Sequence, residues 1–314
     1  MTSPAVPLAQ YRFTLRALEP ICLPDYSGSA WRGVFGHALK DLACVTKQKT
    51  CSSCQLYRGC VYSYLFETPP PLGSEKMANG SAAPHPYILV PSDAKVLQVG
   101  ETYALGLTLF GRANRHLDYV IYALNKAGER GIGRDHGRFE LHTVAQKSAD
   151  GSHQIIYKKG ESVRSQPLFE RDVPALPDAV TITLHTPLRL RSKGKNVRPE
   201  GFLFRQFFSS LLRRFSLLRY FHSDAPLRGD VVQLAALAHS VTLLEADLRW
   251  HEWRRYSSRQ KNVIPMGGIV GSFCIKTSQL APLWPYLWLG QQMHTGKGSS
   301  MGLGRYSLML EAKK

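Results

Sequence analysis

Three groups of residues in this sequence could do chemistry, and a glycine-rich loop at residues 296–304 is the first of them. The loop holds four glycines, with Lys297 inside it and Arg305 directly after it. Because glycine accepts positive φ and leaves the backbone accessible, successive N–H groups could face one anion. The loop therefore predicts phosphate contact, although a turn without a ligand could have the same composition. The binding candidates are Lys297, Gly298, Gly302, Gly304 and Arg305.

Two familiar nucleotide loops do not fit this stretch. From Gly290 the order is G-x5-G-K-G, one residue too long for the nucleoside-triphosphate loop and without a Ser or Thr after the lysine. The dinucleotide fingerprint needs a strand before it and a helix after it, whereas residues 281–293 predict a helix and residues 305–311 a strand. A nucleotide site is therefore not supported.

A cysteine cluster is the second group. Four of the six cysteines fall within residues 44–60 with the spacing C-x6-C-x2-C-x5-C. The central C-x2-C pair suits tetrahedral Zn²⁺, and the two outer cysteines would complete a four-thiolate knuckle. The metal would be structural, since no position for a bound water is evident; ordinary free thiols are the alternative. The ligand candidates are Cys44, Cys51, Cys54 and Cys60.

Basic side chains form the third group. The 314-residue chain carries 40 Lys and Arg against 23 Asp and Glu, a net charge of +17. Such an excess favours a polyanionic partner, nucleic acid first. The tracts are too dense to interpret only as a solvated surface. The RNA-binding candidates are Arg189, Arg191, Lys193, Lys195, Arg198, Arg205, Arg213, Arg214, Arg254, Arg255, Arg259 and Lys261.

Composition also argues against a membrane protein. No apolar run approaches the length of a membrane span, and residues 1–10 lack the basic-then-apolar pattern of a secretory signal. No lysine-rich amphipathic terminal helix is evident either. We therefore expect a cytoplasmic protein that makes no membrane contact.

The elements that must position these residues form a repeated order. Alternation of apolar and polar residues at 8–18 predicts a strand, and Ser29 is expected to cap the helix that follows. The first half then predicts strands at 87–90, 102–110, 139–144 and 153–157 and a helix at 117–127. The second half predicts strands at 179–190, 241–250, 269–275 and 305–311 and helices at 201–221, 227–239 and 282–293.

This order predicts an α+β protein of two tandem ferredoxin-like (βαββαβ, RRM-like) domains. We expect an N-terminal domain at 1–161 that carries the cysteine knuckle, and a C-terminal domain at 178–314 that carries the glycine-rich loop. Residues 162–177, with three prolines, form the expected linker. The base-stacking aromatic signature of RNA-recognition sheets is absent, so RNA would lie along loops and a helix face.

Several segments together resemble the CRISPR-associated endoribonucleases that process precursor RNA, the Cas6 family of the RAMP superfamily. They are Trp31-Arg32-Gly33, Cys51-x2-Cys54-x5-Cys60-x-Tyr62, Pro187-Leu188-Arg189-Leu190-Arg191, Arg255-Tyr256-Ser257-Ser258-Arg259-Gln260, Gly267-Gly268-Ile269-Val270-Gly271 and the terminal Gly302-Leu303-Gly304-Arg305-Tyr306. The terminal loop resembles the hallmark of the superfamily, and the other segments resemble a branch with a cysteine knuckle, with type IV processing nucleases as a further similarity.

The resemblance implies a substrate and a reaction. The substrate is the repeat stem-loop of a CRISPR transcript, cut without a metal ion by attack of the ribose 2′-OH, which leaves a 2′,3′-cyclic phosphate. The family often keeps the product hairpin bound, and members can join other CRISPR effector subunits. A noncatalytic RAMP subunit that binds guide RNA, and a zinc-stabilised single-strand binder from outside the family, are the alternatives.

The catalytic residues follow from the same resemblance. His37 is the leading candidate because many family members place a catalytic histidine on the first helix, and histidine transfers protons near neutral pH. Tyr26 would supply a hydroxyl, while Arg32 and Lys40 would stabilise the crowded phosphorus. Arg32 would dominate in a member that works without histidine. His294 is a weaker candidate, because a histidine at a helix C-terminus is often structural.

Overall fold

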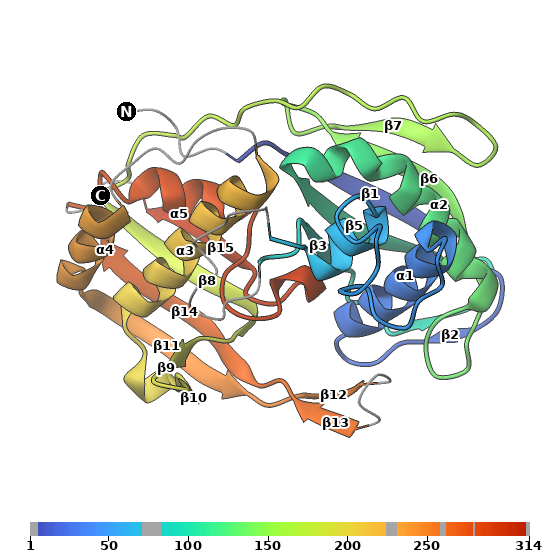
Figure 1. Ribbon diagram of the computed structural model, residues 1–314. Helices are drawn as coiled ribbons and strands as arrows, with labels where there is room; N and C mark the ends of the chain where they lie inside the picture. Colours follow the sequence, from blue (N-terminus) through green and yellow to red (C-terminus); the bar gives the residue numbers. More distant parts are fainter. Residues whose placement is uncertain (1–5, 71–82, 224–230, 258–261, 279, 312–314) are drawn as a thin grey trace. The chain divides into compact units, whose positions relative to one another are not determined.

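A computed structural model describes residues 6–70, 83–223, 231–257, 262–278 and 280–311 (Figure 1). The chain divides into two compact units. The N-terminal unit is Val6–Glu170 with Leu217–Pro226, and the C-terminal unit is Met1–Ala5, Arg171–Ser216 and Leu227–Lys314. The division after Glu170 falls inside the stretch expected as a linker, and the assignment of Leu217–Pro226 to the first unit was not expected. The domain limits given above stay a prediction.

The N-terminal unit is built on one antiparallel sheet. Its strands are β1 (Leu8–Ala17), β3 (Tyr87–Pro91), β5 (Thr102–Phe110), β6 (Phe139–Lys147) and β7 (His153–Lys158), in the order β3-β5-β1-β6-β7. Helices α1 (Gly28–Ala43) and α2 (Leu117–Arg130) pack against each other and contact β3 and β6 respectively. A small pair of strands, β2 (Ile21–Cys22) and β4 (Val96–Leu97), and a π-helical turn, η1 (Ser63–Glu67), complete the unit.

Sequence periodicity explains these elements. Alternate residues of β1, such as Phe13 and Leu15, are fully buried, as expected for a strand with one face on the core. In α1 the buried residues Trp31, Phe35 and Leu39 recur every four residues and form one apolar stripe. The Trp31 ring packs edge-on against Phe139 of β6 at 5.3 Å. This packing fixes which face of α1 is left for function.

The C-terminal unit repeats the same topology. Its sheet has the order β11-β14-β8-β15, the same chain-relative order as β3-β5-β1-β6 in the first unit. It contains β8 (Ala179–Leu188), β11 (Leu243–His251), β14 (Gly268–Lys276) and β15 (Tyr306–Glu311), with α3 (Phe204–His222), α4 (Val231–Ser240) and α5 (Trp284–Gly290). The prediction of an α+β fold of tandem ferredoxin-like units is confirmed.

Local details differ from the sequence prediction. Helix α1 begins at Gly28 after Ser27, whose hydroxyl hydrogen-bonds Tyr103 instead of capping the helix, so the expected cap at Ser29 is wrong. Helix α3 begins three residues later than expected, because Pro199–Gly201 form a separate 3₁₀ turn. Two hairpins were not expected, β9 (Arg191–Ser192) with β10 (Lys195–Asn196), and β12 (Arg254–Ser257) with β13 (Asn262–Pro265). Within the described ranges, no helix is long and apolar enough to span a membrane.

Candidate functional site

Helix α1 does not bring its two leading candidates together. Arg32 and His37 are five residues apart, which places them about 140° apart around a helix of 3.6 residues per turn. His37 is exposed and makes no hydrogen bond with the described part of the chain. Arg32 is half-buried and faces the interior of the unit. The two candidate side chains therefore point to different sides of the helix.

Arg32 instead meets a histidine that the sequence analysis missed. Its Nη2 atom donates to Nε2 of His85 at 3.2 Å, because a guanidinium has no acceptor. Its guanidinium carbon also lies 5.2 Å from the centre of the Phe66 ring, a cation–π contact. His85 stands between two prolines just before β3. No spacing signal in the sequence links it to Arg32.

Gly36 explains how Phe66 reaches Arg32. A Cβ atom at Gly36 would lie 2.6 Å from a carbon of the Phe66 ring, so only glycine admits the ring this close to α1. Glycine inside a helix costs about 1 kcal/mol relative to alanine. The cost is offset by an aromatic surface beside the helix, on which Phe66 stacks with Tyr62 at 5.3 Å and 5°. Lys40 lies over Tyr62 at 5.6 Å, so Arg32 and Lys40 occupy one aromatic platform.

The hydrogen bonds around His85 define its tautomer. Since Nε2 accepts from Arg32, the neutral ring carries its proton on Nδ1, which lies 3.4 Å from Oγ1 of Thr68. The Thr68 hydroxyl in turn donates to the carbonyl of Tyr64 at 3.3 Å. Each donor thus meets an acceptor in the order Arg32, His85, Thr68, Tyr64. Thr68 has φ of 48°, a left-handed conformation that is unusual for a β-branched residue.

A buried histidine holds the segment that precedes His85. His222 donates from Nε2 to the carbonyl of Pro84 at 2.8 Å, so its Nδ1 accepts from the hydroxyl of Tyr64 at 3.2 Å. Both ring nitrogens are satisfied, and the side chain is fully buried.

Tyr26 is half-buried in the loop before α1. The catalytic roles of Tyr26, Arg32, His37 and Lys40 stay predictions.

The glycine-rich loop of the C-terminal unit has the expected conformations. Gly296, Gly298, Gly302 and Gly304 all have positive φ, between 68° and 90°. At Gly304 a Cβ atom would overlap the carbonyl oxygen of Thr295. Thus at least this glycine is required for the path of the chain.

Most of the loop amides, however, already donate hydrogen bonds within the protein. The N–H of Lys297 donates to the backbone carbonyl of Arg189 at 2.9 Å, and the N–H of Gly304 donates to the backbone carbonyl of Pro187 at 3.2 Å. The N–H of Gly302 donates within the loop to Ser299 at 2.8 Å. Gly302 and Gly304 are also buried. The expected backbone cradle is therefore largely used for internal hydrogen bonds, and the exposed side chains of Lys297 and Arg305 are what the loop offers to an anion.

Arginines gather beside the loop. Arg189 is half-buried, and burial lowers its pKa, with the positive charges of Arg191 and Arg255 adding to the effect. Its Nη1 reaches the Met266 sulfur at 3.1 Å, a weak acceptor, and its Nε has no hydrogen-bond partner in the described chain. No carboxylate among the described residues pairs with Arg189. An anion would relieve this concentration of like charge.

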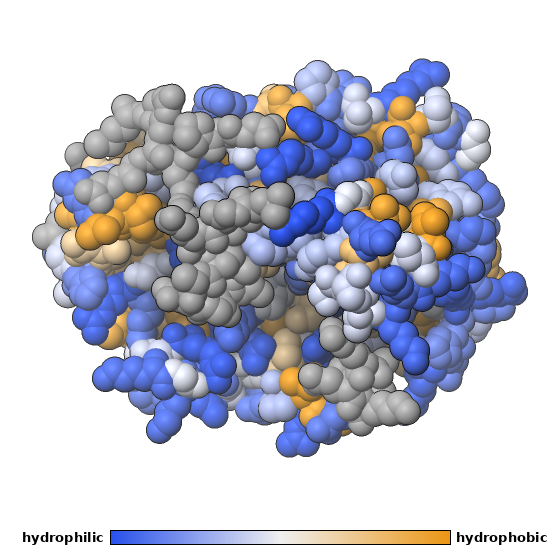
Figure 2. All heavy atoms as spheres, viewed as in Figure 1, coloured by the Kyte–Doolittle hydropathy of each residue, from blue (hydrophilic) through white to orange (hydrophobic). Residues whose placement is uncertain are grey.

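The other basic candidates are mostly on the surface of this unit. Arg198 stacks over Trp250 at 3.7 Å. Figure 2 shows hydrophilic residues gathered around the β9–β10 hairpin, which carries two of the predicted lysines. Arg214 differs, because burial lowers its pKa to about 10 and its Nε donates to the Met293 carbonyl at 2.6 Å. The exposed candidates are Arg191, Lys193, Lys195, Arg198, Arg205, Arg213 and Arg254. Arg259 and Lys261 lie outside the described residues.

His294 is an interior residue. It is 4% exposed and has φ of 54°, and its Nδ1 has no hydrogen-bond partner in the described chain. Burial lowers its pKa to about 3, and the charges of Arg214 and Arg305 act in the same direction. A neutral, enclosed imidazole cannot exchange protons with a substrate near pH 7.

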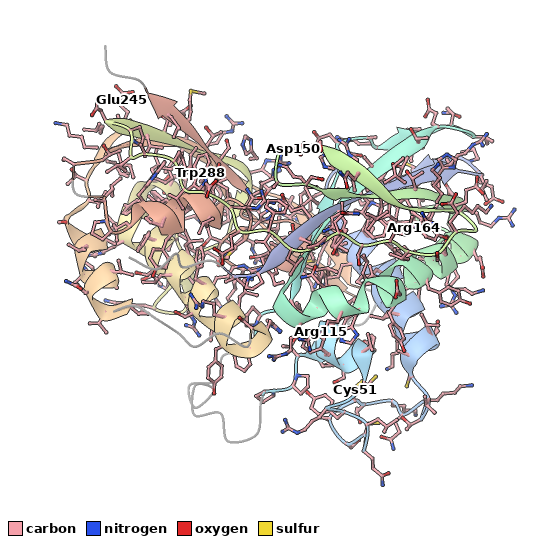
Figure 3. All side chains as sticks on the ribbon, turned by 90° about the horizontal axis from the view of Figure 1, so that it is seen from above. Cys51, Arg115, Asp150, Arg164, Glu245 and Trp288 are labelled. Atoms are coloured by element: carbon pink, nitrogen blue, oxygen red, sulfur yellow. The ribbon has the colours of Figure 1, made fainter. Side chains whose placement is uncertain are left out.

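The four candidate zinc ligands lie on one loop between α1 and η1. Cys44, Cys51, Cys54 and Cys60 all line one small pocket, and all are free thiols. Figure 3 shows Cys51 on a loop that projects beyond the helices of the N-terminal unit. Within the described ranges, no three His, Cys, Asp or Glu residues converge closely enough to hold a metal ion. The donor chemistry fits zinc, whereas the side-chain placement is not that of a closed ligand set.

The repeated sheet order defines the class of fold, which is a pair of tandem ferredoxin-like units with a basic glycine-loop region in the second unit. Residues 6–168, slightly more than half of the chain, match the family model AF_1859_N, N-terminal domain. Residues 182–306 match the model described as CRISPR-associated endoribonuclease Cas6. The chain therefore belongs to the family that the AF_1859_N model describes, and its C-terminal part is similar to the Cas6 endoribonucleases.

Known structures share this fold at low identity. The product complex of a Thermus thermophilus Cas6 aligns with TM-score 0.58 and 16% identity, covering 97% of this chain and all of that chain. A chain of the partial Cas6-RT-Cas1–Cas2 complex aligns with TM-score 0.59 and 13% identity over this whole chain, which spans 48% of that one. An uncharacterized protein of Archaeoglobus fulgidus is 26% identical over 126 residues, 39% of this chain and 41% of that protein.

Proposed function

We propose that this protein is a metal-independent endoribonuclease that binds the repeat stem-loop of CRISPR precursor RNA and cuts it to give guide RNA. The observation that carries the proposal is the match of residues 182–306 to the Cas6 endoribonuclease model. The net charge of +17 and the arginines beside the glycine loop support an RNA partner. RNA contacts would be made by side chains, since most loop amides already have protein acceptors.

The proposed reaction is an internal transesterification. The 2′-oxygen attacks the adjacent phosphorus, the bond from phosphorus to the 5′-oxygen breaks, and the products carry a 2′,3′-cyclic phosphate and a 5′-OH. A base must take the proton from the 2′-OH, an acid must supply one to the 5′-oxygen, and cations must balance the crowded phosphorus. Arg32, half-buried beside the imidazole of His85 on the aromatic platform, supports this chemistry.

The direct test is incubation of the purified protein with the repeat RNA of its own locus in EDTA. A single cut is expected, with a cyclic phosphate on the upstream product. A 2′-deoxy substitution at the cut position should abolish it, because the nucleophile is then absent. Salt-sensitive binding of the hairpin without any cut would contradict the nuclease and favour the noncatalytic RAMP subunit. Equal affinity for an unstructured RNA would contradict stem-loop recognition.

Two further parts of the proposal concern partners and metal. Since the same fold occurs in a chain of the Cas6-RT-Cas1–Cas2 complex, the proposal extends to association of this protein with other CRISPR subunits.

The cysteine loop would hold one structural Zn²⁺ after its four thiols close on the pocket that they share. Elemental analysis of purified protein should give about one zinc per chain, lost in Cys51→Ser with Cys54→Ser and kept in Cys274→Ser. A zinc-free protein of unchanged stability would contradict the knuckle.

A further inference from the structure

We propose that His85 is the proton-transfer residue of the cleavage site and that Arg32 is its phosphate-binding partner. This assignment rests on the nuclease function proposed above, and it replaces His37 as the leading histidine. It starts from the hydrogen bond between Arg32 Nη2 and His85 Nε2, 3.2 Å long, which joins α1 to the residue pair before β3.

The hydrogen bonds give His85 the tautomer of a base. Nδ1 carries the proton and is directed to Thr68, so the lone pair of Nε2 is presented toward Arg32. Thr68 is 3% exposed and its hydroxyl proton is used by the Tyr64 carbonyl, so it stays an acceptor for Nδ1–H. A carbonyl, hydroxyl or carboxylate behind a histidine commonly fixes the active ring nitrogen in this way.

Among the described residues, a guanidinium and two aromatic rings lie beside His85. Arg32 faces it from α1, and Tyr87 of β3 stacks on its ring at 5.8 Å and 16°. The ring centre of Phe66 of η1 lies 6.4 Å from that of His85. Tyr62 stacks on Phe66, and Lys40 makes a cation–π contact with Tyr62. Both charged groups named here are cations, as expected where an anionic phosphate binds. His85 and Arg32 are half-buried, so a substrate can reach them.

A second arginine–histidine pair in the described part of the chain lacks these features. Arg205 Nη1 lies 3.2 Å from Nδ1 of His239, but both side chains are exposed. The second ring nitrogen of His239 has no hydrogen-bond partner among the described residues to fix the direction of the ring. This pair therefore supplies a control with the same two residue types and no ordered surroundings.

Substrate binding would free the base. A phosphate accepts stronger, charge-assisted hydrogen bonds from a guanidinium than a neutral imidazole does, so Arg32 would turn from Nε2 to the scissile phosphate. The 2′-OH proton then passes to Nε2 as the 2′-oxygen bonds to phosphorus. The bond from phosphorus to the 5′-oxygen breaks, and the 5′-oxygen takes a proton from water. The hydroxide that remains takes the proton from the His85 imidazolium, which restores water and the neutral ring. No oxidant, reductant or metal is needed for this balance.

The test uses full-length protein, the repeat RNA of its own locus and EDTA, with single-turnover rates at saturating protein. His85→Gln keeps an amide oxygen that can accept from Arg32 but has no basic nitrogen. We expect its cleavage rate to fall about 10²- to 10⁴-fold, with hairpin affinity changed less than about threefold. The cleavage rate of wild type should fall at acidic pH, where the base becomes protonated. The pH–rate profile of His85→Gln should lack this acidic limb. His239→Ala is the control and is expected to cleave within about threefold of wild type, and His37→Ala is measured beside His85→Gln to compare the two candidate histidines.

A second variant covers the case in which position 85 does not tolerate change. Thr68→Val removes the acceptor of Nδ1–H at nearly constant volume, so the acidic limb should move to lower pH while circular dichroism and hairpin affinity stay unchanged. If wild type cleaves and His85→Gln cleaves at the same rate, the assignment of His85 is overturned, while the proposed nuclease function stands. Loss of the acidic limb only in His37→Ala would also overturn it. Absence of any cut by wild type would overturn the nuclease function, and with it this inference.

Discussion

Each of the two units presents an arginine that pairs with no carboxylate among the described residues, but the groups beside the two arginines differ. In the N-terminal unit Arg32 donates to an imidazole whose other nitrogen is fixed by Thr68. In the C-terminal unit Arg189 donates to a thioether, and its neighbours Arg191 and Arg255 carry the same charge. An imidazole can exchange a proton near neutral pH and a thioether cannot. The first arrangement therefore suits a reaction, and the second suits holding an anion.

The region with the most arginines is not the region that holds the proposed reacting pair. Most basic residues of the predicted tracts lie in the C-terminal unit, where the repeated positive charge would follow a phosphate backbone. The proposed reacting pair is a single arginine and a single histidine that come from segments 53 residues apart. A variant in one region should therefore change cleavage rate, and a variant in the other should change affinity.

The largest effect is expected at Arg32. Arg32→Ala removes the donor that would balance charge on phosphorus, and such a loss costs about 10²- to 10³-fold in rate, roughly 3–4 kcal/mol. Single-turnover cleavage at saturating protein measures it, and hairpin affinity should change little because one contact among many is lost. Arg32→Lys should recover part of the rate as a point charge without the planar fork. An unchanged rate in Arg32→Ala would remove the contrast between the two arginines.

Gly304 tests whether the glycine loop is first of all a structural element. Alanine there would need φ of 68° and would overlap the Thr295 carbonyl. We expect Gly304→Ala to destabilise the protein by more than about 2 kcal/mol, measured by urea unfolding. Gly201→Ala is the control, because its Cβ would meet open space at ordinary φ, and we expect a change within about 0.5 kcal/mol. Equal stability of the two variants would mean that the loop rearranges freely.

Arg189 should separate affinity from rate. Arg189→Gln is expected to weaken hairpin binding by about 1–2 kcal/mol and to lower the salt dependence of log K by about one, as for one lost phosphate contact. The cleavage rate of the saturated complex should stay unchanged. Arg164→Gln, at an exposed residue of the N-terminal unit outside the predicted tracts (Figure 3), removes the same charge as a control. A matching loss in Arg164→Gln would indicate a general charge effect without a site at Arg189.

Sequence periodicity was enough for the architecture, because each unit buries one face of a sheet under helices. The alternation in β1 and the apolar stripe of α1 predicted both elements to within two residues. The start of α1 was misjudged, because the Ser27 hydroxyl is used by Tyr103, 76 residues away. Local sequence propensity cannot predict a hydrogen-bond partner so far away in the sequence.

The contacts of Arg32 could be predicted less well, for the same physical reason. Arg32 and His37 were both named as candidates from the sequence, but the turn of the helix separates their side chains. His85 comes beside Arg32 only because β3 is packed next to α1 and Gly36 admits the Phe66 ring. In the glycine loop, composition predicted the positive φ values correctly, but it could not show that the amides would be used by carbonyls such as those of Pro187 and Arg189.

His294 gives the smallest expected effect and the sharpest contrast with His85. Its pKa in the folded protein is lowered to about 3, while an unfolded chain has the ordinary value near 6.5. Below pH 6.5 the unfolded state therefore binds the extra proton, so stability that is present above pH 6.5 is lost as the pH falls toward 3. This residue alone should cost about 1.4 kcal/mol per pH unit in that window.

His294→Asn isolates this contribution, because asparagine accepts the left-handed conformation that His294 adopts at φ of 54° and does not titrate. The variant should be less stable than wild type at pH 7, because it fills the buried site less well, but its free energy of unfolding should fall less steeply between pH 6.5 and 4.5. Urea unfolding at several pH values measures the difference in slope, in which the carboxylates common to both proteins cancel. Parallel curves would mean that His294 is accessible and protonated in the folded protein. The C-terminal unit would then also offer a proton-transfer group, and the division of roles between the two regions would fail.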